Sequence, residues 1–145
     1  SFAGLFFFFF VLRVRMGGNM LLNSGTPTVR VVIAYGGTTM FSDISAASTL
    51  DADRNAWFLN FDIVAQGNAD QSLNGYLGMG IIAAKTAPTT GIGDAWSTAE
   101  NIGPVSGAAA VDSNAANRLL SVQITFSVSN AANELVVESA TVELL

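Results

Sequence analysis

The sequence contains no cysteine and no histidine among its 145 residues. These absences exclude a disulfide framework, a thiolate nucleophile and a Cys/His metal site. A nucleophilic serine would have to use Lys85, the only lysine, as its base. Lys85 begins a stretch rich in Gly, Pro and Thr, where we expect its amine to be solvated and protonated. We therefore predict that the chain is not an enzyme and that it uses no cofactor.

Charged residues are also scarce, at 12% of the chain, and the formal net charge is −5. A nucleic-acid-binding surface needs clustered Lys and Arg, so we expect no nucleic-acid partner. The basic residues are unevenly distributed, because residues 1–42 contain Arg13, Arg15 and Arg30 and no acidic residue. We predict that these arginines contact acidic residues of another subunit, and solvated arginines are the alternative.

No apolar run is long enough to cross a membrane as a helix, which takes about 20 residues. The most apolar stretch, residues 5–12, has only 8 residues and is followed by Arg13. An export signal is disfavoured, because such signals carry their positive charge before the apolar block, whereas Arg13 and Arg15 follow it. We therefore expect no membrane partner. A short apolar run of this kind is typical of a strand buried on both faces.

We interpret residues 1–11 as an apolar N-terminal strand or arm. Adjacent phenylalanines on an unpaired strand would promote aggregation, so this segment needs a cover from the domain or from a partner chain. An origin outside the native sequence is the alternative for these first residues. The predicted partner contacts in this segment are Phe6, Phe7, Phe8, Phe9 and Phe10.

Apolar and polar residues alternate with a period of two along much of the chain, which predicts β-strands. The clearest examples are residues 57–65 and 120–128, and Gly-rich stretches such as 17–19 are expected to form turns. About eight strands and no amphipathic helix predict an all-β fold, an antiparallel, jelly-roll-like β-sandwich with a single domain over residues 12–145. In the last strand we expect one face to contain Val136, Ala140, Val142 and Leu144.

One acidic segment is superficially similar to a calcium-binding loop. Asp51, Asp53 and Asn55 occupy alternate positions, but Ala56 stands where the sharp turn of such a loop requires glycine. The alternative is a polar turn whose side chains bond to nearby backbone groups. We expect no metal site here.

Two further candidates depend on the fold. Asp62 and Glu138 would form a glycosidase pair only if their carboxyl groups were about 5–5.5 or 6.5–9.5 Å apart. Residues 85–107 form a long connection in which Trp96 is a candidate anchor for a binding partner.

Three segments together resemble a jelly-roll domain of structural proteins from tailed bacteriophages. They are residues 12–25, 48–67 and 119–145. The third is similar to the closing strand of trimeric jelly-roll domains in phage virion proteins. The second is similar to a strand-entry motif of the same proteins, at Arg54, Asn55, Trp57 and Leu59.

The resemblance implies a homotrimeric protein on the capsid surface of a virion. In that role the chain would be a decoration or cement protein that binds and stabilises the shell made by the major capsid protein. The alternative is a head or tail fibre knob that binds a host-surface receptor or glycan, with Trp96 as the contact. The sequence has no shaft or repeat region that a fibre would need, which favours the cement protein.

Overall fold

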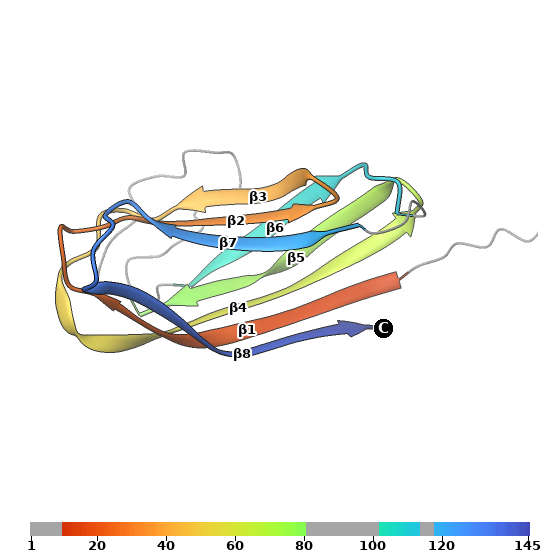
Figure 1. The fold of residues 1–145 in the computed structure, drawn as a ribbon. Coiled ribbons are helices and arrows are strands. Elements are labelled where there is room, and N and C mark those ends of the chain that lie inside the picture. Colours follow the sequence, from red (N-terminus) through yellow and green to blue (C-terminus); the bar gives the residue numbers. More distant parts are fainter. Residues whose placement is uncertain (1–9, 81–101, 114–117) are drawn as a thin grey trace, which may run out of the picture.

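The computed structural model describes residues 10–80, 102–113 and 118–145. These residues form two antiparallel β-sheets that pack face to face as a sandwich (Figure 1), which confirms the predicted fold class. Sheet A contains, in spatial order, β6 (Ile102–Ala109), β5 (Asp70–Met79), β4 (Asp51–Gly67), β1 (Phe10–Leu22) and β8 (Asn133–Leu144). Sheet B contains β3 (Thr38–Ile44), β2 (Val29–Tyr35) and β7 (Leu120–Phe126).

The strand pairing is nested, because early strands pair with late ones. β1 pairs with β8, β2 with β7 and β4 with β5, all antiparallel. A long hairpin that rolls up into two layers gives this order, and it agrees with the expectation of a jelly-roll-like sandwich. The strands divide five and three between the two sheets rather than evenly.

The core lies between the sheets and is made by the alternating apolar positions. Every second residue of β4 from Trp57 to Ala65 is buried, as the alternation predicts. On β7 the predicted inward residues pack against the core but are only partly buried, because β7 is an edge strand. These residues are Leu120, Val122, Ile124 and Phe126.

The predicted turn at residues 17–19 is wrong, because β1 continues through it to Leu22. A Cβ atom on Gly18 would lie 1.9 Å from the carbonyl oxygen of Val136 on β8. The glycine is therefore required by a close approach of two strands and not by a reversal of the chain.

A register shift in the β1–β8 ladder also changes which face of β8 is apolar. Gly17 is opposite Ser139 but Gly18 is opposite Val137, so Glu138 forms a bulge. The bulge places Val137 on the face of Ala140, and the prediction that Val136 shares this face is wrong.

Two polar side chains fix the position of β8. The Trp57 indole Nε1 donates a hydrogen bond of 3.0 Å to the Val136 carbonyl, across the intervening strand β1. The Asn133 amide accepts from the backbone N–H groups of Asn23 and Ser24 and donates to two backbone carbonyls, those of Ser24 and Val128. This amide therefore joins the chain that follows β1 to the chain that precedes β8.

Candidate functional site

One long side of the sandwich leaves apolar side chains uncovered, where the edge strands β7 and β8 of the two sheets lie. We call it the β7–β8 side. On β8, Val142 is 61% exposed and Leu144 is 72% exposed, although both are paired with core-facing positions of β1. The side is defined by Leu12 and Met16 of β1, by Leu120, Val122, Ile124 and Phe126 of β7, and by Ala140, Val142 and Leu144 of β8.

The opposite long side is closed. There β3 contacts β6, and a Cβ atom on Gly107 would lie 1.8 Å from the carbonyl oxygen of Met40. The two sheets thus come within backbone contact of each other at β3 and β6. Core-facing apolar residues such as Met40 and Val105 are buried at this side, whereas Val142 and Leu144 at the β7–β8 side are exposed.

The outer face of sheet A, which points away from sheet B, holds a second candidate surface. A shallow depression of about 450 Å³ crosses β1, β4, β5 and β6. Where it crosses β1 and β4, Arg13 donates two hydrogen bonds of 2.9 Å to the carboxylate of Asp62. This bidentate contact holds the pKa of Asp62 below its usual value.

The three predicted interface arginines do not share one face. Arg13 and Arg15 project from the outer face of sheet A, whereas Arg30 belongs to sheet B and donates to Ser42 Oγ at 3.0 Å. Alternation on β2 points Arg30 away from the core, so it lies on the opposite outer face.

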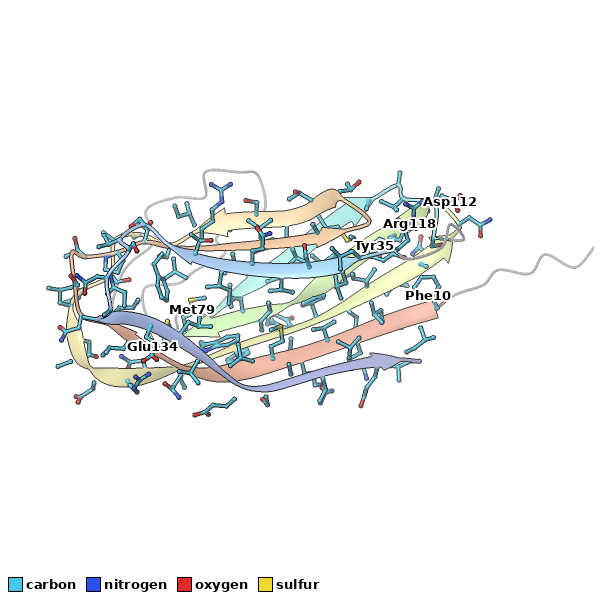
Figure 2. The ribbon with its side chains drawn as sticks, viewed as in Figure 1. Phe10, Tyr35, Met79, Asp112, Arg118 and Glu134 are labelled. Carbon is cyan, nitrogen blue, oxygen red and sulfur yellow. The ribbon has the colours of Figure 1, made fainter. Side chains whose placement is uncertain are left out.

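The predicted apolar arm is described only where it enters β1. Phe10 is half-buried and is paired with Ala65 of β4. Figure 2 shows Phe10 at the same end of the sandwich as Asp112 and Arg118, with Glu134 at the other end. The other predicted contacts, Phe6, Phe7, Phe8, Phe9 and Trp96, lie outside the described residues.

The acidic segment forms the first residues of β4, so the predicted turn is wrong, but its side chains do bond to their own neighbourhood. The Asp51 carboxylate accepts hydrogen bonds from the Asn55 side chain and from the Asp53 backbone N–H, both at 2.9 Å. These two bonds lower the pKa of Asp51. The local hydrogen bonds agree with the alternative to a calcium loop, but they form within a strand and not in a turn.

The candidate glycosidase pair is not brought together. Asp62 lies in the same cross-strand row as Glu143, while Glu138 is five positions further along β8. At about 3.3 Å per residue this is a separation on the order of 16 Å along the strand alone. Glu138 instead accepts a hydrogen bond of 2.7 Å from Asn19.

Among residues 10–80, 102–113 and 118–145, no group of three or more acidic side chains is placed to hold a metal ion. The same ranges contain no helix long and apolar enough to cross a membrane.

The sequence interpretation missed the polar and aromatic residues that surround the Arg13–Asp62 pair. Asn60, Asn74 and Tyr76 all line the depression. Their signal was present, because each alternates along its strand with core-facing residues such as Leu59, Leu73 and Leu77 and must face outward. A comparison with protein families, curated proteins and solved structures found no match for this chain.

Proposed function

We propose that this chain is a structural protein of a virus particle, a decoration or cement protein that binds the capsid shell and stabilises it. The apolar β7–β8 side is the observation that carries the proposal. Contiguous exposed apolar surface beside an unpaired strand edge is what a protein partner covers. The virus particle in this proposal is that of a tailed bacteriophage, because residues 12–25, 48–67 and 119–145 resemble structural proteins of such phages.

The dimensions of the β7–β8 side favour a contact that includes strand pairing. β8 has 12 residues and is therefore about 40 Å long, and sandwiched sheets lie about 10 Å apart. A flat contact over this strip covers roughly 400 Å², about half of what each partner buries in a standard interface. Among the described residues no further strand pairs with the outer edge of β8 or β7, and an incoming strand there adds backbone hydrogen bonds and further area.

The proposed partners are two further copies of the chain in a homotrimer and the major capsid protein of the shell. Both are protein surfaces, and the chain's low charge suits burial between subunits. Burial of apolar surface contributes roughly 25 cal/mol per Å², so a protein repeated over a shell adds stability at every junction.

The first test is the mass of the chain in solution, measured by light scattering after size exclusion. We expect a trimer for the wild type and a monomer for the double variant Val142→Ser/Leu144→Ser. The circular dichroism spectrum should change little, because both side chains are already exposed in the single chain and its fold does not depend on them. Leu50→Ser is the matched control, since Leu50 is exposed but lies before β4. Equal masses for the wild type and the double variant would contradict the proposed interface.

The second test addresses the particle itself. Peptides of this chain should be found by mass spectrometry in purified virions of the virus that encodes it, in amounts comparable to the major capsid protein. Purified particles that lack the chain would refute the virion assignment and leave the solution result to stand alone.

A further inference from the structure

The depression on the outer face of sheet A has features of a ligand site, and it is separate from the β7–β8 side. Its volume of about 450 Å³ lies within the range of small-molecule sites, roughly 300 to 1,000 Å³. It is open and shallow, so a ligand would lie along the sheet rather than inside the protein. The proposed structural role does not use this surface.

The antiparallel register places its side chains in two adjacent rows across the sheet. Residues opposite each other on neighbouring strands have Cβ atoms about 4.5–5.5 Å apart, which allows them to contact one ligand together. The first row contains Arg13, Asp62, Asn74 and Ser106. The second row contains Arg15, Asn60, Tyr76 and Pro104.

In the first row, the opposite charges of Arg13 and Asp62 compensate each other. Arg13 and Asp62 satisfy each other through two hydrogen bonds of 2.9 Å. The pair is partly buried, which holds its planar groups in a fixed orientation. This part of the depression therefore presents little net charge to a ligand.

The second row supplies unused hydrogen-bonding groups and an aromatic ring. Within the described residues, the side chains of Arg15 and Asn60 have no hydrogen-bond partner, and both residues are exposed. Tyr76 is 62% exposed beside Asn60. The next row adds Phe58, whose ring packs directly on Gly78. A Cβ atom on Gly78 would lie only 2.3 Å from the Cε1 atom of Phe58. A flat ring therefore stands next to planar amide and guanidinium groups.

We infer that this depression binds an oligosaccharide, with a sugar ring stacked on Tyr76 and its hydroxyl groups bonded to Arg15, Asn60 and Asn74. A sugar ring has an apolar C–H face and a rim of hydroxyls that donate and accept, which matches an aromatic ring surrounded by amides. A polyanion such as a nucleic acid fits poorly, because the chain carries a net charge of −5 and Arg13 is already paired. A protein partner would be expected to meet a more apolar centre than these amides provide.

The test uses the full chain, fluorescently labelled, on an array of bacterial and animal oligosaccharides, followed by calorimetric titration with the oligosaccharide that gives the strongest signal. We expect saturable binding that Tyr76→Thr weakens by about tenfold or more, since the ring contact is lost. Threonine keeps the strand propensity of the position, so the fold should be retained. Tyr76→Phe keeps the ring and should bind nearly as the wild type does.

Two controls separate this site from the proposed assembly surface. Thr125→Ala alters an exposed position on sheet B and should leave binding unchanged. The double variant Val142→Ser/Leu144→Ser should retain oligosaccharide binding per chain even when its mass falls. The inference is overturned if no oligosaccharide binds above background, or if Tyr76→Thr and Tyr76→Phe bind equally. Saturable binding of a protein instead of a glycan at this face would also overturn it.

Discussion

Replacing Gln71 by methionine removes a buried polar link between strand β5 and the chain that follows β6. The Gln71 side chain is 0% exposed. Its Nε2 donates to the Val111 carbonyl at 2.8 Å and to the Asn68 carbonyl at 3.3 Å, and its Oε1 accepts from the Val111 backbone N–H at 3.0 Å. The side chain thus satisfies both backbone groups of Val111, a residue that is itself buried.

The expected loss follows from the groups left behind. Methionine has nearly the same length, but it cannot replace the acceptor for the Val111 N–H or the donor to the Val111 carbonyl. Each buried backbone group without a partner costs about 1–3 kcal/mol, which gives about 2–6 kcal/mol for the two. The apolar methionine recovers part of this by burial, so we expect a net loss of about 2–4 kcal/mol. For a chain of this size the melting temperature should fall by roughly 5–15 °C.

The assay is urea unfolding followed by tryptophan fluorescence, with the midpoint and the slope both fitted. The matched control is Gln123→Met, the same substitution at an exposed position of β7, which should change stability by about 0.5 kcal/mol or less. A loss below about 1 kcal/mol for Gln71→Met with an unchanged slope would refute the reasoning. It would mean that water or a shifted backbone satisfies Val111 in the variant.

Two further predictions concern pH and packing. The contact with Arg13 lowers the pKa of Asp62 in the folded state, so it stabilises the protein above the unfolded pKa of about 4, and this contribution disappears as the pH falls through the lower folded pKa. The variant Asp62→Asn should therefore lower the urea midpoint at pH 7 but have little effect near pH 2. An equal effect at both pH values would count against the ion pair. Gly107→Ala should strongly destabilise the fold or prevent it, because the new Cβ would lie 1.8 Å from the Met40 carbonyl oxygen. Gly67→Ala is the control and should be tolerated, because the nearest atom to its Cβ would be 4.0 Å away. Thermal unfolding of both variants makes the comparison.

Alternation along the chain was enough to predict the fold class and most of the core. Trp57 and Ala65 belong to the same buried face because side chains of a strand point to alternate sides, and this is a local property of the backbone. The absence of cysteine and histidine likewise limited the possible chemistry directly, since composition does not depend on folding.

The pairing of strands was not readable in the same way. Gly17 and Gly18 predicted a turn, because glycine is as common at turns as at close contacts between strands. Only the position of β8 shows that Gly18 faces the Val136 carbonyl. The bulge at Glu138, next to this contact, places Val136 on the opposite face from the expected one.

The candidate sites show the same division. The sequence by itself determined which side chains point outward, including Arg15, Asn60 and Tyr76, because this follows from their alternation with core-facing positions along each strand. Only the tertiary structure decided that these residues share one depression, that Arg30 lies on the other sheet and that the β7–β8 side is uncovered. The physical reason is that strand pairing joins distant parts of the chain. Strand periodicity specifies the face on which a residue lies but not the strand that will lie beside it.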